Sequence, residues 1–106
     1  MAGLGDLAGL LKQAQKMQRD IARIQEELKA RTVEGSASGG AVRVVATGGL
    51  ELAKIHIDPS VLSSGDASLV EDMVKMAANQ ALEKARELSK SELGKLTGGL
   101  SIPGMF

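Results

Sequence analysis

Few residues in this sequence have the types and spacing that catalysis requires. The only histidine, His56, stands between Ile55 and Ile57 in a strand-like segment, and the chain has no cysteine to join it as a metal ligand. Asp58 precedes a proline, a pair that is more typical of a turn than of a catalytic carboxylate. No serine lies in a G-x-S-x-G motif, the signature of a nucleophile elbow. The sequence therefore predicts no enzyme, no metal or other cofactor, and no small-molecule substrate.

The glycines do not form a phosphate-binding loop either. Those near the N-terminus (Gly3, Gly5 and Gly9) follow no strand, as a dinucleotide-binding loop would require. The cluster from Gly35 to Gly40 leads into a strand, so no helix N-terminus is available there to bind an anion.

Basic residues give a stronger signal, because four of them recur with the period of a helix: Lys12, Lys16, Arg19 and Arg23. At 3.6 residues per turn all four fall within a sector of about 60°. This sector lies opposite the apolar positions of the same segment, and its nearest acid, Asp20, lies to one side. The four residues predict a site for the phosphates of DNA. A solvated coiled-coil face explains the same pattern and stays open as an alternative.

Composition limits the kind of nucleic acid. The chain has 13 basic and 13 acidic residues, so binding by bulk positive charge is excluded and the basic residues must be segregated on one face. The only aromatic residue is Phe106, whereas modules for single strands stack bases on aromatic side chains. Contact with the backbone of duplex DNA is the mode that remains. Arg31, Arg43 and Lys90 are weaker candidates for such contacts.

A long helix is expected to carry the four basic residues, over residues 6–30. Its apolar residues alternate at spacings of three and four, as in a heptad seam: Leu7, Leu10, Ala14, Met17, Ile21, Ile24 and Leu28. No stretch approaches the roughly 18 apolar residues of a membrane span, and no signal peptide is evident. We expect a soluble, intracellular protein.

The next segment alternates with the period of strands. Strands are expected over residues 32–37, 41–47 and 50–57, with a turn at residues 38–40 and a hairpin in which Gly48 and Gly49 supply positive φ angles. Pro59 ends the third strand because it has no amide hydrogen for a ladder. One face should carry Val42, Val44 and Ala46 of the second strand. In the third strand, Ala53, Ile55 and Ile57 should share one face, and Leu52, Lys54 and His56 the other.

A second helix is expected over residues 68–93, after a linker at residues 60–67. Either Ser68 or Asp66 could cap it, and Gly94 could end it. Its inner face should carry Leu69, Met73, Met76, Ala77, Gln80, Ala81, Lys84, Ala85 and Leu88. The prediction is a two-layer α+β domain over residues 1–94, an antiparallel three-stranded meander flanked by two long helices, followed by a flexible tail over residues 95–106.

One copy of this domain should leave apolar surface exposed. The first helix is about 37 Å long, whereas strands of six to eight residues cover only about 20–27 Å. Exposed seam residues would cost about 1.5–3 kcal/mol for each large side chain. We therefore expect a homodimer whose interface includes Leu7, Leu10, Ala14, Met17 and Ile21. The alternative is that the second helix of the same chain covers them.

Assembled in this order, the segments resemble the YbaB/EbfC family. The resemblance rests on the Gln-rich residues 11–18, the Gly-rich turn between the first two strands, the Ile57-Asp58-Pro59 motif, residues 69–85 of the second helix and the Gly-Pro-containing tail. It implies an α-β-β-β-α subunit, a tweezer-shaped homodimer, duplex DNA binding and a place in the bacterial nucleoid, in the cytoplasm. It does not imply catalysis, and it supplies no short DNA-contact motif.

Two functions remain after the sequence has been considered. The leading one is a non-enzymatic, dimeric DNA-binding protein that organises the chromosome or regulates genes. The alternative is an adaptor that docks onto proteins of DNA recombination, repair or replication through its helices and its apolar tail residues, Leu100, Ile102, Met105 and Phe106.

Overall fold

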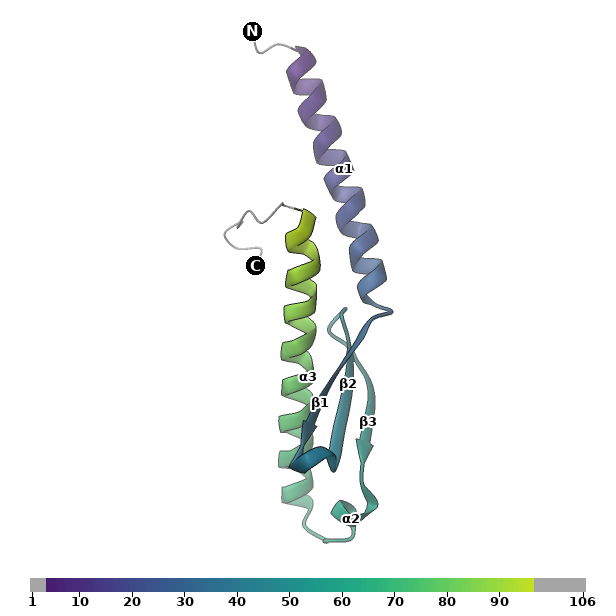
Figure 1. The fold of residues 1–106 in the computed structure, drawn as a ribbon, viewed down its shortest axis with the longest axis vertical. Helices are drawn as coiled ribbons and strands as arrows, with labels where there is room; N and C mark the ends of the chain where they lie inside the picture. Colours follow the sequence, from purple (N-terminus) through teal and green to yellow (C-terminus); the bar gives the residue numbers. More distant parts are fainter. Residues whose placement is uncertain (1–3, 97–106) are drawn as a thin grey trace.

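A computed structural model describes the backbone of residues 4–96 and the side chains of residues 6–96. The molecule is elongated, with extents of 74 × 23 × 17 Å. A three-stranded sheet packs against a long helix, and a second long helix extends past the end of the first (Figure 1). The elements are α1 (Leu4–Leu28), β1 (Thr32–Ala37), the 3-10 turn η1 (Ser38–Gly40), β2 (Val42–Thr47), β3 (Leu52–Ile57), α2 (Pro59–Leu62) and α3 (Ala67–Leu96).

The sheet is the predicted antiparallel meander, in the order β1-β2-β3. Ala37 pairs with Val42 across the first hairpin, and Val42 pairs with Ile57 across the second. The β2 residues that were predicted to share one face are all fully buried: Val42, Val44 and Ala46. The two-layer α+β prediction is confirmed.

The third strand departs from simple alternation. The pairing of β2 with β3 contains a bulge between Val45 and Ala46. Val45 pairs with Lys54, whereas Ala46 pairs with Leu52, two residues earlier in β3. Paired residues of a sheet share a face, so Leu52 lies on the side of Ala46. The prediction that Leu52 shares a face with Lys54 and His56 was wrong, because the extra residue of a bulge reverses the alternation beyond it.

The hairpin between β2 and β3 also differs from the prediction. The residue with positive φ is Leu50, at 64°, and not Gly48 or Gly49. Gly48 is required for a different reason: a side chain does not fit at this position, since a Cβ there would lie 2.8 Å from the carbonyl oxygen of Leu28. The Thr47 hydroxyl oxygen accepts hydrogen bonds from the N–H groups of Gly49 and Glu51, which stabilises the turn.

Helix α3 covers β1 and β2 with a row of small residues. Met73, Ala77, Ala81 and Ala85 are buried against the sheet. Leu69 and Met76, predicted on this inner face, are 46% and 63% exposed. Val70, Val74, Ala78 and Leu82 are half-buried in their place, so the buried face of the helix is rotated from the predicted one.

Two polar side chains of α3 reach the outer edge of β1. The Ser36 N–H donates to the Gln80 Oε1 at 2.8 Å, and the Lys84 Nζ donates to the carbonyl oxygen of Glu34 at 2.8 Å. Both backbone groups point away from β2, so they would otherwise bond only to water or to another chain.

The segment between β3 and α3 was predicted as a linker but contains the short helix α2. Asp58 caps it by accepting from the Ser60 N–H at 3.0 Å, and Pro59 occupies the first turn. Asp66, not Ser68, caps α3, because its Oδ1 accepts from the Leu69 N–H at 3.0 Å. The helix passes through Gly94, the predicted stop, and continues to Leu96; the tail residues beyond it lie outside the described residues.

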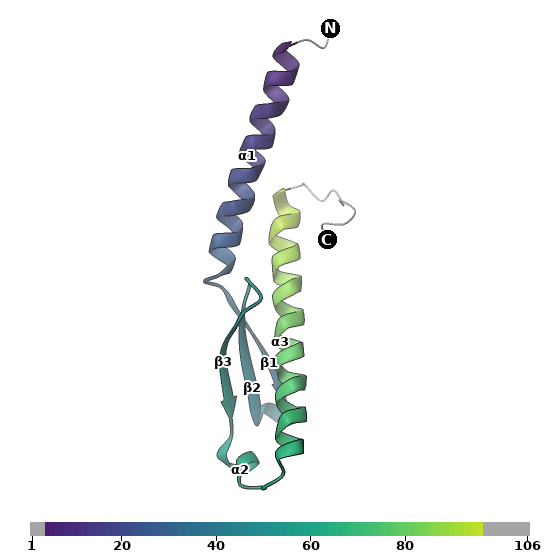
Figure 2. The same cartoon turned by 180° about the vertical axis from the view of Figure 1, so that it is seen from behind.

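Helix α1 is anchored only at its C-terminal end. Ile24 and Leu28 are buried, whereas every residue from Asp6 to Arg19 is exposed. Arg31, just after the helix, forms an ion pair with Glu92 of α3 at 3.0 Å. From behind, the N-terminal part of α1 again projects beyond the end of α3 (Figure 2). Among the helices within the described residues, none is long and apolar enough to cross a membrane.

Candidate nucleic-acid interface

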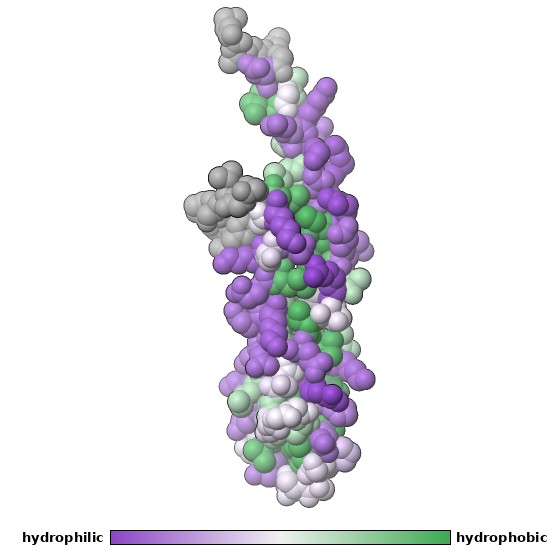
Figure 3. Space-filling model, viewed as in Figure 1, coloured by the Kyte–Doolittle hydropathy of each residue, from purple (hydrophilic) through white to green (hydrophobic). Residues whose placement is uncertain are grey.

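The four predicted DNA-contacting residues all lie on the exposed part of α1: Lys12, Lys16, Arg19 and Arg23. We call this set the basic stripe. Since α1 is continuous from Leu4 to Leu28, the helical spacing places the four side chains on one side. In space-filling view, hydrophilic residues line the outer side of α1 and hydrophobic ones gather toward α3 (Figure 3).

Asp20 interacts with two members of the basic stripe. Its carboxylate lies 3.1 Å from Lys16 Nζ and 3.5 Å from Arg23 Nη2. The hydrogen bond from Lys16, followed by the charges of Lys16 and Arg23, lowers the pKa of Asp20 despite partial desolvation. Arg23 also lies 3.9 Å from Glu27. The sequence had placed Asp20 to one side of the stripe, whereas the structure brings it into contact with both cations.

These ion pairs do not remove the stripe from solvent. The side chains of Lys16 and Arg23 remain 71% and 59% exposed, so their contacts with Asp20 are surface ion pairs that water and salt screen. Lys12 and Arg19 form no ion pair with any residue whose side chain is described here. The stretch from Lys12 to Arg23 therefore presents four cations against one carboxylate, with two cations unpaired.

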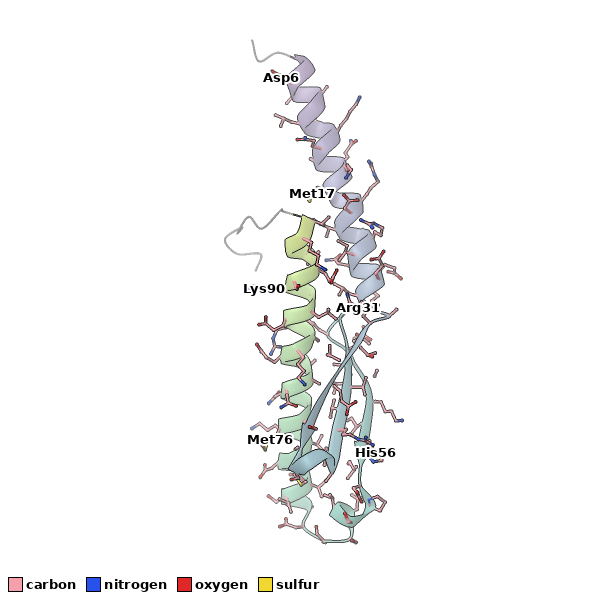
Figure 4. The ribbon with its side chains drawn as sticks, in the orientation of Figure 1. Asp6, Met17, Arg31, His56, Met76 and Lys90 are labelled. Carbon is pink, nitrogen blue, oxygen red and sulfur yellow. The ribbon has the colours of Figure 1, made fainter. Side chains whose placement is uncertain are left out.

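The predicted dimer interface lies on the opposite side of α1. Leu7 and Leu10 are 53% and 63% exposed, Met17 is 38% exposed, Ala14 is exposed, and Ile21 is half-buried. We call these five residues the apolar seam. Helix α3 of the same chain ends beside Met17, where Lys95 and Leu96 border a shallow hollow together with Gln13, Lys16 and Asp20. Met17 points toward that end (Figure 4). Residues before Gln13 extend beyond α3, so α3 leaves Leu7 and Leu10 uncovered.

The three weaker candidates lie apart from the basic stripe. Arg31 is engaged by Glu92, Lys90 is exposed on α3, and Arg43 is exposed on the sheet face that α3 does not cover. Sequence reasoning missed Lys54, which shares that face with Arg43 through the pairing of β2 with β3. The alternation of β3 was visible in the sequence, but its register against β2 was not.

His56 lies on the same uncovered face, exposed and opposite Arg43. Within the described residues, no group of three histidine, cysteine, aspartate or glutamate side chains is placed to hold a metal ion.

Comparison with known proteins decides the family. A sequence model of the YbaB/EbfC DNA-binding family matches residues 3–100. The chain belongs to the YbaB/EbfC DNA-binding family. This membership confirms the resemblance drawn from the sequence, and it supports DNA as a partner of the protein.

Relatives in the YbaB/EbfC family are similar over almost their whole length. A nucleoid-associated protein of Acetivibrio thermocellus is 52% identical and aligns with 96% of this chain and 91% of its own. A nucleoid-associated protein of Pelotomaculum thermopropionicum is 49% identical and aligns with 96% of this chain and 97% of its own. The crystal structure of the uncharacterized protein HP0035 from Helicobacter pylori has the same fold, with a TM-score of 0.74, 24% identity and coverage of 92% of this chain and 100% of that one.

Proposed function

We propose that this protein is a non-enzymatic, nucleoid-associated protein that binds duplex DNA as a homodimer, through phosphate contacts made by the basic stripe. The observation that carries the proposal is the exposure of all four cations on the side of α1 opposite the apolar seam. Two stripes in one dimer would double the number of cations available to a single duplex. Organisation of the chromosome or regulation of genes, in the nucleoid of the bacterial cytoplasm, is the role that fits binding of this kind.

Phosphate contact is favoured over base stacking by the side chains available. The sequence has no tryptophan or tyrosine, and its one phenylalanine is the last residue. Lysine and arginine bind phosphate oxygens by charge-assisted hydrogen bonds, which carry little sequence information. The proposed mode is therefore binding to duplex DNA with weak dependence on its sequence.

Salt dependence tests this mode directly. If each protomer of the dimer contributes four contacts, the logarithm of the binding constant should fall with the logarithm of salt concentration with a slope of about −7. The measurement is fluorescence anisotropy of a labelled duplex between low and physiological salt, with a single strand of the same length as competitor. A slope near zero, or stronger binding to the single strand, would contradict the proposal.

The homodimer is proposed from the exposed part of the apolar seam. Changing Leu7, Leu10 and Met17 to glutamine is expected to convert a dimer into a monomer with little loss of helix content, because these side chains make few contacts within one chain. Light scattering over a dilution series measures the mass, and circular dichroism measures the helix. The DNA salt slope should fall to about half in the variant. A wild-type species of 11 kDa at micromolar concentration would exclude the dimer.

An adaptor of the DNA recombination, repair or replication machinery is the second candidate. The zero net charge and the pairing of Lys16 and Arg23 with Asp20 favour it, since both weaken the field that DNA would experience. The apolar tail residues that such an adaptor would use lie outside the described residues. The salt titration separates the two functions, because an adaptor would show no steep dependence.

A further inference from the structure

The sheet has one face that no helix covers. The register of β2 and β3 places Arg43 directly opposite His56 and Lys54 opposite Val45, so these three basic residues share the face turned away from α3. All three are exposed, and His56 points away from α3 (Figure 4). Side chains directly opposite in a sheet have Cβ atoms about 5 Å apart, and diagonal neighbours lie about 7–8 Å apart. We call Arg43, Lys54 and His56 the sheet patch.

The cations of the sheet patch are free to bind an anion. Arg43 and Lys54 form no ion pair with any other described side chain, in contrast to Lys16 and Arg23 of the basic stripe. Two acids are near them. Glu34 lies opposite Val45, and Asp58 follows His56 by two residues along the chain.

Asp58 is already engaged by its own helix cap. Its Oδ1 accepts from the N–H and from the hydroxyl group of Ser60, both at 3.0 Å. These hydrogen bonds are the main cause of its lowered pKa, and the charges of His56 and Arg43 add to them. Among the described strand residues that the register places on this face, Glu34 is the one acid, and it offsets one of the patch's cations.

Neither the sheet patch nor the basic stripe is covered by α3, since all of their residues are exposed. Helix α3 provides the reference, because it runs along the sheet and ends beside Met17. The patch is on the sheet face opposite α3. The stripe is on the side of α1 opposite the apolar seam, with Lys16 at its border beside the end of α3. A straight polyanion lying along the surface that α3 leaves open would meet both sets of cations.

We propose that the open sheet face is a second phosphate-binding site for duplex DNA, formed by Arg43, Lys54 and His56, and that it binds the same duplex as the basic stripe. This inference rests on the proposed function. At 3.4 Å for each base pair, the 74 Å length of the molecule corresponds to roughly 20 base pairs. A duplex of that length is long enough to contact both sites.

The test compares two double variants that remove the same charges. Arg43→Gln with Lys54→Gln removes the two permanent cations of the sheet patch. Arg86→Gln with Lys75→Gln removes one arginine and one lysine from exposed positions on α3, on the other side of the sheet. With a 25-base-pair duplex, the patch variant should bind roughly tenfold more weakly at 0.1 M salt and show a slope shallower by about 0.9 for each lost contact. The α3 variant should stay close to wild type.

Two further measurements keep the test independent of folding. Glu34→Gln removes the acid from the sheet face and is expected to tighten binding about two- to threefold, an outcome that unfolding would not produce. His56→Gln should weaken binding less than Arg43→Gln does.

The outcomes distinguish a failure of the sheet patch as a DNA-binding site from a failure of the proposed function. Equal weakening in the two double variants would mean a general effect of charge and would overturn the patch. An unchanged patch variant, while loss of the basic stripe abolishes binding, would overturn the patch and leave the proposed function intact. If the wild-type protein shows no salt-dependent binding to the duplex, the proposed function fails, and this inference fails with it.

Discussion

Replacement of Lys12, Lys16, Arg19 and Arg23 by glutamine is expected to weaken duplex binding by roughly 10²–10³-fold near physiological salt, and to make the salt slope much shallower. Each lost cation is a lost phosphate contact, and a dimer loses eight. Glutamine keeps helix propensity close to that of lysine and arginine, so α1 should remain folded. Anisotropy titrations at several salt concentrations measure both quantities.

The control carries the same change in net charge at positions away from the basic stripe: Lys29, Lys75, Lys84 and Arg86, each changed to glutamine. It should bind within a few-fold of wild type. Binding that is equally weak in both quadruple variants would show that total charge, and not the stripe, determines affinity.

A pair of double variants refines this result. Lys12→Gln with Arg19→Gln removes the two unpaired cations, and Lys16→Gln with Arg23→Gln removes the two that contact Asp20. Each pair consists of one lysine and one arginine. The first should weaken binding more, because Lys16 and Arg23 have to give up part of their interaction with Asp20 when they bind a phosphate. The reverse order would place the DNA closer to the C-terminal end of α1.

Gly35→Ala is expected to cause the largest loss of stability among single substitutions. A Cβ at Gly35 would clash with the carbonyl oxygen of Ala77 and lie 2.5 Å from the amide nitrogen of Ala81. Both atoms belong to the backbone of α3, which cannot yield as a flexible side chain can. The helix would have to move off the sheet and expose part of the core around Val44. Overpacking of this kind costs about 3 kcal/mol, or roughly 12–20 °C in the melting temperature of a domain of this size.

Gly9→Ala is the matched control. Nothing lies within 4 Å of the Cβ position at Gly9, which is inside α1. The same chemical change there should stabilise the protein slightly, since alanine is the better helix former by about 1 kcal/mol. Thermal unfolding followed by circular dichroism compares the two. If the Gly35→Ala variant has the same melting temperature as the wild type, α3 lies farther from β1 than it does in the structure.

Much of the fold followed from periodicity. Alternation placed Val42, Val44 and Ala46 on one face, which is the buried one, and the predicted inner face of α3 included the alanines that pack on the sheet. The features that were missed depend on contacts between distant segments. Leu52 changes face because a bulge is set by the pairing with β2, and Gly48 is needed for the approach of Leu28, twenty residues earlier in the chain.

The candidate site was predictable in its positions but not in its interactions. The helical period placed Lys12, Lys16, Arg19 and Arg23 on one side of α1, as the structure does. It could not show that Asp20 would contact two of them, since rotamers of long side chains decide that. The sheet patch escaped notice because Arg43 and Lys54 belong to different strands, and only the register brings them to one face. Helix α2 was missed because Asp58 and Pro59 also suit a plain turn.

The hydrogen bonds from Gln80 and Lys84 to β1 bear on how such a protein behaves when crowded. At a high local concentration, an open strand edge can recruit a neighbour's strand and start an insoluble aggregate. The amide of Gln80 and the ammonium group of Lys84 already occupy the outward N–H of Ser36 and the outward carbonyl of Glu34. A foreign strand would have to displace both before it could extend the sheet at β1. Neighbouring molecules at high concentration are thereby hindered from pairing along β1.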